Sequence, residues 1–414
     1  MGLWSSNAVR YRVVAAGTVS YTCLTFIWFS LPAYLPEITT ELGLSSTQAG
    51  ILVGAVPVTY VPLALFSGLA VDRIGPVRSL AGGLVVFGGA QVGRSIATGF
   101  PLLLGCTVLI GVGATVITFG LPKLVSALFP PEQTGAPSSV YLVGASLGTA
   151  SAFAVGRPVL GPFLGGWRAL FLWSGTIAVC YAGVWLLAMR ISSWAPNAED
   201  SDPSFAVETL EADLKTVLTH RELRLVVLVG VTYLLIIHGL QGWLPTILES
   251  RGLSAERAGQ TTTLLVIANV VGVLTVPGLA DRFRARRPAI VASGFTAFCG
   301  VGAIIAGGTT IITAAGIVAV GLGVGGLSPL VRAIPPDLDG IGARLTGTAV
   351  GLVFAVGEVG GFLGPVLIGS LRDVTGTYAA GLAVLAGGGL LAVAAGAAMR
   401  TVDSPADPSV DVGD

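Results

Sequence analysis

Three ionisable side chains lie in the middle of long apolar runs of this chain, where a charge is unexpected. Glu358 stands in the segment AVGEVGGFLGP, Arg157 in FAVGRPVLGP and His238 in LLIIHGLQGW. An ionised side chain inside a bilayer costs at least about 2.5 kcal/mol on insertion scales, so such residues normally face a polar interior. A carboxylate can carry a proton, a guanidinium can hold an anion, and an imidazole changes its charge near about pH 6.5. We therefore expect these three residues to bind substrate, with proton coupling by Glu358 or His238.

Each of these side chains also has a purely structural interpretation, and these alternatives stay open. Glu358 could be a structural acid hydrogen-bonded to backbone that neighbouring glycines open, Arg157 a counter-ion between helices, and His238 a satisfied core histidine. Four further residues in apolar runs complete the expected substrate site: Asn269, Trp28, Phe29 and Tyr60. For these four, interhelical hydrogen bonding and aromatic packing are the alternative roles.

The composition shows that the elements positioning these residues are surrounded by lipid. Hydrophobic residues make up 53% of the 414 positions and charged residues only 11%, which excludes an ordinary soluble protein. A helix needs roughly 20 apolar residues to cross about 30 Å of hydrocarbon. The sequence predicts an all-α membrane protein with twelve transmembrane helices. The predicted spans are residues 13–36, 47–71, 79–98, 101–128, 138–163, 168–190, 223–248, 257–280, 288–306, 308–334, 345–370 and 377–399.

The sequence indicates no catalytic or cofactor site. No group of His, Cys, Asp and Glu has the spacing of metal ligands, no nucleophile stands beside a base, and the four cysteines fall inside predicted spans as packing residues. The segment GLGVGG at residues 321–326 fits a dinucleotide-binding pattern, but no strand precedes it and it lies in an apolar run, which favours helix packing. We expect no enzyme activity, no cofactor, no metal and no nucleic-acid partner.

Basic residues are distributed unevenly between the two sides of the predicted spans. With a cytoplasmic N-terminus, most Lys and Arg residues fall on the cytoplasmic side. The outer segments and their edges then hold only Arg94, Arg168, Arg251, Arg257 and Arg372. The positive-inside rule therefore predicts a multi-pass protein of the plasma membrane with both termini in the cytoplasm. The first span is too long for a signal peptide and no cleavage site follows it.

The chain contains an internal repeat. Residues 34–50, YLPEITTELGLSSTQAG, align without a gap on residues 243–259, WLPTILESRGLSAERAG, at an offset of 209. The duplication predicts two pseudo-symmetric six-helix bundles, and transport sites lie between such repeats. The predicted domains are an N-terminal bundle (1–190), a cytoplasmic linker with a short amphipathic helix (191–222), a C-terminal bundle (223–400) and a disordered cytoplasmic tail (401–414).

A glycine, an acidic residue and several basic residues recur after the second span of each half. The first copy is GLAVDRIGPVRSL at residues 68–80, and the second is GLADRFRARR at residues 278–287. Such a charge cluster can hold a neighbouring helix end in one conformation and release it in another, although a topology anchor is the simpler interpretation. The residues expected to gate the conformational change are Gly68, Asp72, Arg73, Arg78, Asp281 and Arg282.

With these motifs the sequence resembles the major facilitator superfamily over about residues 10–400. The motif of that superfamily between spans two and three is matched by Gly68, Asp72, Arg73, Gly75 and Arg78. Pro76 departs from it, because a basic residue is usual at that position. The resemblance implies a secondary active transporter that gives alternating access to one central site, and it leaves the substrate open.

Spans four and five qualify the resemblance. Span five follows the antiporter pattern of the superfamily, G-x8-G-x3-G-P-x2-G-G, from Gly148 onward, except that Arg157 replaces the second glycine. Thr107 stands where proton-coupled drug exporters usually carry an arginine. The segments GLPKLVSALFPPEQTG (120–135) and GWLPTILESRGLSAERAG (242–259) resemble the cyanate permease and nitroimidazole transporter branch.

The leading hypothesis is a monomeric secondary transporter for a small anion or small organic acid. In it, Arg157 contacts the anion and protonation of Glu358 or His238 couples uptake to the proton gradient. Counted from the Gly-Pro pairs that follow them, Arg157 and Glu358 should lie at one depth in corresponding helices. A proton-coupled exporter of drugs or metabolites is the alternative. A non-transporting receptor or scaffold is a third hypothesis, disfavoured because a receptor needs no pair of gating clusters.

Overall fold

The computed structural model describes residues 7–191, 219–308, 310–338 and 341–399, and the regular structure of these residues is helical. The helices before the central linker are α1 (Asn7–Leu42), α2 (Ser46–Ile74), α3 (Pro76–Ser95), α4 (Phe100–Leu128), η2 (Pro131–Gln133), α5 (Gly135–Ser151), η3 (Ala152–Leu160), α6 (Gly161–Leu164) and α7 (Trp167–Ile191). Those after it are α9 (Arg221–Ser250), α10 (Ala255–Arg282), α11 (Arg286–Ala306), α12 (Thr310–Ala333), η4 (Pro335–Asp337), α13 (Gly342–Thr375) and α14 (Ala379–Ala398).

The helices agree with the predicted spans. In the described part of the chain, 11 helical segments are long and apolar enough to cross a membrane. The remaining predicted span, α3, is less apolar because it carries Arg78, Gln91 and Arg94. The all-α membrane fold is thus confirmed. The amphipathic helix expected in the linker and the predicted tail lie outside the described residues.

The internal repeat builds the same turn twice. Gly43 in the turn between α1 and α2 has φ 61°, and Gly252, 209 positions later in the turn between α9 and α10, has φ 91°. L side chains rarely adopt such positive φ values, so glycine is needed at both places. Ser45 and Ser254 then each accept a hydrogen bond from the backbone N–H three residues on, which caps α2 and α10.

Span five is not a continuous α-helix. It consists of α5, the nine-residue π-helix η3 and the single turn α6. Pro158 lacks the N–H that an α-helix requires at its position, and the wider turns of a π-helix accommodate this loss. Gly144 and Gly148 precede this segment and lie against α1, where Thr22 and Thr25 donate hydrogen bonds to backbone carbonyls of α5. The glycine spacing of span five therefore does serve close packing against α1.

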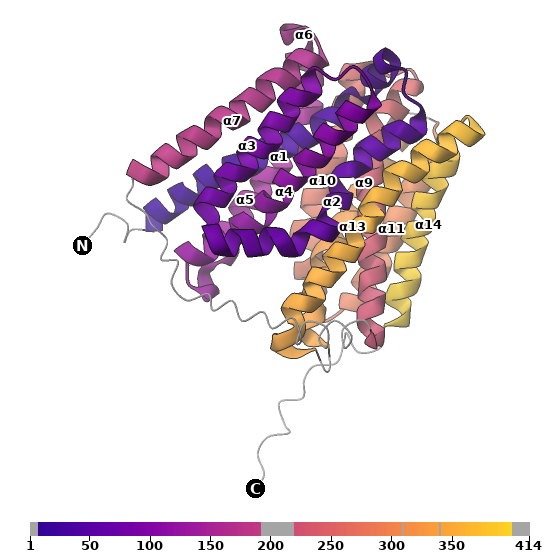
Figure 1. Ribbon diagram of the computed structural model, residues 1–414. Coiled ribbons are helices and arrows are strands. Elements are labelled where there is room, and N and C mark those ends of the chain that lie inside the picture. The colour runs from indigo at the N-terminus through magenta and orange to yellow at the C-terminus, as the bar shows by residue number, and fades with distance from the viewer. Residues whose placement is uncertain (1–6, 192–218, 309, 339–340, 400–414) are drawn as a thin grey trace. The chain divides into compact units, whose positions relative to one another are not determined.

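By their internal contacts the helices fall into two units, which are described separately. The first unit contains α1 to α7 together with Leu234–Ile267 and Glu358–Leu385. In it α3 packs against both α4 and α7, α2 packs on α4, and α1 packs on α5 and η3 (Figure 1). Its core is apolar and includes the buried side chains of Leu24, Phe87, Ile110 and Trp185. The division into two six-helix bundles stays a prediction.

The second unit contains Ala268–Gly357 and the described parts of Phe205–Tyr233 and Ala386–Asp414. Here α11 and α12 approach closely through glycines. A Cβ built on Gly300 would lie 2.6 Å from the carbonyl oxygen of Gly316, and one on Gly323 would lie 2.5 Å from that of Ser293. Helix packing is therefore confirmed as the role of the GLGVGG segment.

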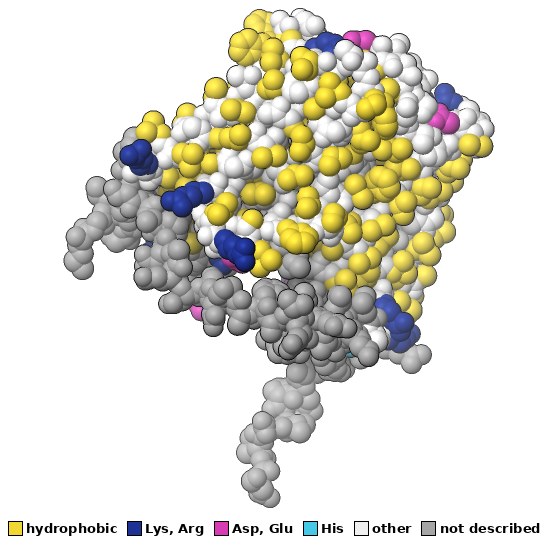
Figure 2. Space-filling model, in the orientation of Figure 1, with side chains coloured by type: hydrophobic (Ala, Val, Ile, Leu, Met, Phe, Trp, Pro, Cys, Tyr) yellow, Lys and Arg dark blue, Asp and Glu magenta, His cyan; other side chains and the backbone are white. Residues whose placement is uncertain are grey.

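Large apolar side chains are exposed along many of the helices. Examples are Phe66, Phe163, Leu274 and Ile311. Figure 2 shows hydrophobic side chains over the middle of the visible helices, with Lys and Arg side chains toward helix ends. An apolar surface bordered by charged ends is what a lipid bilayer requires of the helices that cross it.

Candidate functional site

Glu358 and His238 are neighbours in the first unit. His238 lies midway along α9 and Glu358 midway along α13, and Nδ1 of the histidine is 3.8 Å from Oε2 of the acid. The two side chains are only 12% and 11% exposed. Gly361, one turn after the acid, makes room for both, because a Cβ there would lie 2.5 Å from Nδ1 and 2.8 Å from Oε2. Two groups that can each carry a proton thus share one buried place.

Aromatic rings adjoin this pair. The indole of Trp28 on α1 stacks on the imidazole of His238, with ring centroids 5.6 Å apart. It also stacks on Phe29 at 5.3 Å and on Tyr60 of α2 at 6.3 Å. Five of the predicted substrate-binding residues therefore lie together, and we call them the central cluster: Trp28, Phe29, Tyr60, His238 and Glu358. Tyr60 is held further by a 2.9 Å hydrogen bond between its hydroxyl and that of Thr118.

Arg157 is buried in a separate group, which we call the ion cluster (Glu37, Arg157 and Glu249). Its guanidinium donates through Nε to Glu37 at 3.1 Å and through Nη2 to Glu249 at 3.0 Å, and Nη1 bonds both Glu249 and the Ala33 carbonyl. Arg157 is 8% exposed. Its charge is therefore compensated by carboxylates from α1 and α9.

The predicted common depth of Arg157 and Glu358 is wrong. On α9, His238 marks the level of Glu358, whereas Glu249, the partner of Arg157, follows eleven residues later near the helix end. At 1.5 Å per residue the two levels differ by about 16 Å. Counting from Gly-Pro pairs fails because span five contains a π-helix and because a long arginine side chain reaches well beyond its own Cα.

A cavity of about 450 Å³ opens beside the ion cluster. Tyr34, Glu37 and Arg157 form part of its wall, together with the glycines of α6 and the start of α10. Tyr34 is only 1% exposed, and its hydroxyl has no hydrogen-bond partner among the described residues. The cavity near the ends of α1 and α9 is therefore lined by the paired Arg157, by the carboxylates of Glu37 and Glu256, and by the unpaired hydroxyl of Tyr34.

A second contact near the same helix ends joins α13 to α2. The carboxylate of Asp373 accepts hydrogen bonds from the backbone N–H groups of Ser46 and Thr47, at 3.0 and 2.8 Å, and from the Thr47 hydroxyl at 2.7 Å. A carboxylate at a helix N-terminus satisfies unpaired N–H groups and complements the helix dipole. Sequence analysis missed Glu37, Glu249 and Asp373, because each lies near a helix end where acidic residues are common.

The predicted gating motifs form one ion pair in each unit. Nζ of Lys123 on α4 lies 2.8 Å from Oδ1 of Asp72, and Nε of Arg286 lies 2.9 Å from Oδ1 of Asp281. Arg73, Arg78 and Arg282 are exposed. Gly68 has open space beside its Cα, and Gly75 has φ 82° at the start of α3. The sequence did not single out Lys123 as the partner of Asp72.

Arg94 lies in the last turn of α3 and is buried. It is 1% exposed, and its Nε and Nη2 donate to the Thr107 hydroxyl at 3.1 and 2.9 Å. The guanidinium of Arg94 on α3 therefore lies beside Thr107 of α4. Thr107 is the position at which proton-coupled drug exporters of the superfamily usually carry an arginine.

Asn269 belongs to the second unit, where α12 approaches its backbone carbonyl through Gly325. The structure thus shows a helix contact for this residue and does not place it with the central cluster. No group of three His, Cys, Asp or Glu side chains in the described residues could hold a metal ion.

Comparisons with known proteins agree with this architecture. A sequence profile of the Major Facilitator Superfamily matches residues 17–365. The chain is 27% identical over 366 residues to a 3-(3-hydroxy-phenyl)propionate transporter of Escherichia coli, covering 86% of this chain and 85% of that protein. It is 25% identical over 412 residues to a hexuronate transporter of Bacillus subtilis, covering 94% and 92%.

Solved structures show the same fold. A bacterial homologue of the human lysosomal transporter Spinster, crystallised in an inward-facing and occupied conformation, superposes with a TM-score of 0.78 over 95% of this chain and 96% of that one. The sequence identity is 18%, so this likeness shows the fold alone.

Proposed function

Because the chain belongs to the Major Facilitator Superfamily, we propose that it is a proton-coupled secondary transporter that carries a small organic acid across the plasma membrane by alternating access. The family and the relatives named above are transporters rather than enzymes. The names of two relatives, for an aromatic acid and for hexuronates, support an organic acid as substrate. The observation that carries the proposal is the buried pair of His238 and Glu358.

This pair can couple the movement of a proton to that of an anion. An organic acid entering beside Trp28 brings a negative charge into an apolar interior, where an uncompensated charge is costly. Uptake of one proton by Glu358 or His238 balances that charge. Substrate and proton therefore bind most favourably together, which is the requirement for cotransport.

The aromatic residues of the central cluster give the acid a flat apolar surface. Trp28, Phe29 and Tyr60 are stacked in one group, and a favourable ring contact adds about 0.5–1.5 kcal/mol beyond area burial. A ring of the substrate against Trp28 would direct its carboxylate toward His238. Asn269 is still proposed to contact the substrate, as the sequence predicts.

Arg157 serves this cycle in two ways. In the arrangement described, it joins α1, η3 and α9 through Glu37 and Glu249. Alternating access requires such contacts to break when that side opens. Once Glu249 moves away, Arg157 loses part of its compensation and can attract an incoming anion from the adjoining cavity. Arg157 therefore holds the helices together in the arrangement described, and it becomes the predicted anion contact after Glu249 has moved away.

Uptake by proteoliposomes tests the proposal. Radiolabelled 3-(3-hydroxyphenyl)propionate and a hexuronate are offered with an inward proton gradient, and accumulation of one of them above equilibrium is expected. Accumulation should disappear in Glu358→Gln and persist in Glu132→Gln, which neutralises an exposed acid in η2. Uptake driven equally well by membrane potential without a proton gradient would contradict the proposed coupling.

A further inference from the structure

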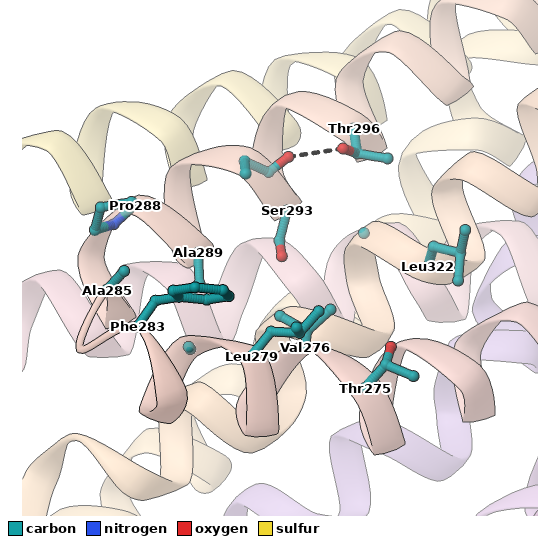
Figure 3. A pocket seen from close by; sticks show the side chains of 13 residues that line it. Thr275, Val276, Leu279, Phe283, Ala285, Pro288, Ala289, Ser293, Thr296 and Leu322 are labelled. Atoms are coloured by element: carbon teal, nitrogen blue, oxygen red, sulfur yellow. Dashed lines mark hydrogen bonds between the residues drawn. The ribbon is translucent and has the colours of Figure 1, made fainter.

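A groove of about 520 Å³ lies in the second unit between α10, α11 and α12 (Figure 3). Its wall includes Leu279 of α10, Phe283 directly after that helix, and Leu322 of α12. The residues of α11 and its preceding turn that face it are mostly small: Ala285, Pro288, Ala289 and Ala292. Small side chains where neighbouring helices face one another leave the volume unfilled. The groove therefore offers space with an apolar lining.

Two of the three hydroxyl groups in this wall are already hydrogen-bonded to backbone carbonyls. The hydroxyl of Thr275 donates to the carbonyl of Val271 at 2.7 Å, and that of Thr296 donates to the carbonyl of Ala292 at 2.8 Å. Leu279 and Phe283 are 54% and 69% exposed. A hydrocarbon chain would cover these two side chains without breaking either of these hydrogen bonds.

The groove has the depth of one membrane leaflet. It begins at the turn between α10 and α11 and extends along α11 as far as Thr296, ten residues after Arg286. At 1.5 Å per residue this is about 15 Å. Half of a hydrocarbon core of about 30 Å has the same extent. One acyl chain of a lipid in the adjoining leaflet therefore matches the groove in length.

Arginines gather at the mouth of the groove. Arg286 pairs with Asp281 at 2.9 Å, and Arg287 donates to the carbonyl of Ala397 at 2.6 Å. Arg282 and Arg284 are exposed, and no ion pair involves either of them within the described residues. Arg284 has φ 49°, a backbone conformation that non-glycine residues rarely adopt.

We propose that this groove binds an anionic phospholipid, with one acyl chain along α11 and the phosphate at Arg282 and Arg284. Guanidinium groups bind phosphate oxygens through paired charged hydrogen bonds, and basic pockets beside transmembrane helices take anionic headgroups. Free phosphate lacks the chain that fills the groove. The acidic C-terminal segment DSPADPSVDVGD is too polar to cover Leu279 and Phe283. The site belongs to the second unit and does not depend on the transported substrate.

Native mass spectrometry of the full-length protein with added lipid tests the site. Phosphatidylglycerol should bind more tightly than phosphatidylcholine of the same chain length. The double variant Arg282→Gln, Arg284→Gln should weaken phosphatidylglycerol binding about 30-fold, since each surface arginine contributes roughly fivefold. The control Arg251→Gln, Arg257→Gln, at the turn between α9 and α10, should leave it unchanged. Ala292→Trp fills the groove from an exposed position and should weaken binding without changing any charge.

Three outcomes would overturn the inference. Equal binding of the two lipids, or no effect of the arginine substitutions, would mean ordinary surface lipid only. Displacement of phosphatidylglycerol by an equal concentration of glycerol 3-phosphate would mean an anion site without the chain. Stronger lipid binding in the variant Asp403→Asn, Asp407→Asn, Asp411→Asn would mean that the acidic segment is the occupant. Thermal unfolding without lipid checks that every variant folds.

Discussion

At the scale of single residues, Glu358 is the group that we expect to carry the coupled proton. Glu358→Gln keeps the shape of the side chain and cannot ionise. It should abolish accumulation against a gradient yet preserve exchange of labelled for unlabelled substrate, because exchange needs no net proton movement. Both activities are measured in the same proteoliposomes. A variant that still accumulates substrate with unchanged pH dependence would transfer the coupling role to His238.

Gly361 is expected to be as sensitive as the ionisable residues it adjoins. A Cβ at this position would lie 2.5 Å from Nδ1 of His238, so Gly361→Ala must push the histidine and Glu358 apart. We expect at least a tenfold loss of proton-driven uptake. Gly351→Ala on the same helix is the matched control, because a Cβ there meets nothing within 4 Å. Similar activity of the two variants would show that the geometry of the pair is unimportant.

Two substitutions of Arg157 distinguish the effect of its charge from the effect of its planar geometry. Arg157→Lys keeps the positive charge but loses the planar fork that reaches Glu37 and Glu249 together. Arg157→Ala removes both and leaves two carboxylates without their cation. Substrate binding, measured by isothermal titration, should therefore weaken less in the lysine variant than in the alanine variant. Unchanged binding and transport in both variants would leave Arg157 a structural residue.

The partners of Arg157 were beyond the reach of sequence analysis, whereas the central cluster was not. His238 and Glu358 stand out because ionisable residues are rare within apolar runs. Glu37 and Glu249 are near helix ends, and the repeat does not mark them, since the equivalent positions at the offset of 209 are Thr246 and Thr40. Their pairing with Arg157 depends on how segments far apart in the chain pack against one another. This packing cannot be read from a single sequence.

At the scale of helices, Asp373 links the end of α13 to the start of α2 and should favour the arrangement described here. Asp373→Asn removes the charge that caps two backbone N–H groups, so the ends of these helices should separate more often. A cysteine at Ser254, in the wall of the cavity near Arg157, should then react several-fold faster with a membrane-impermeant thiol reagent. The assay uses a background without the native cysteines and Glu132→Gln, at an exposed acid of η2, as control; an unchanged labelling rate would exclude this role for the cap.

Helix boundaries were predictable because hydrocarbon thickness sets the length of an apolar run. The turn at Gly43 and Gly252 was predictable as well, since the repeat preserved both glycines and the serines that cap the next helices. The π-helix around Pro158 was not, because a proline in an apolar run signals an interruption without specifying its form. The error about the depth of Arg157 follows partly from that interruption and partly from the length of the arginine side chain.

At the scale of the whole molecule, Asp72 is expected to control the balance between conformations rather than the binding site. Its ion pair with Lys123 joins the ends of α2 and α4 on the predicted cytoplasmic side, while the central cluster involves other parts of these helices. A substitution that changes only the relative stability of two conformations alters turnover much more than intrinsic affinity. Asp72→Asn should therefore reduce transport at least tenfold and change substrate binding by no more than a few-fold.

The partner residue and the second copy of the motif give this prediction its controls. If the ion pair itself acts, Lys123→Gln should reduce transport as Asp72→Asn does, and the double variant should be no worse than either single one, because residues of one pair are not additive. Asp281→Asn breaks the ion pair that the second copy of the motif makes with Arg286, five residues later, and should also slow transport. Transport and binding are measured on the same preparation. Loss of binding with normal exchange rates would place Asp72 at the substrate site and contradict a gating role, whereas additive effects of Asp72→Asn and Lys123→Gln would show that the two residues act independently.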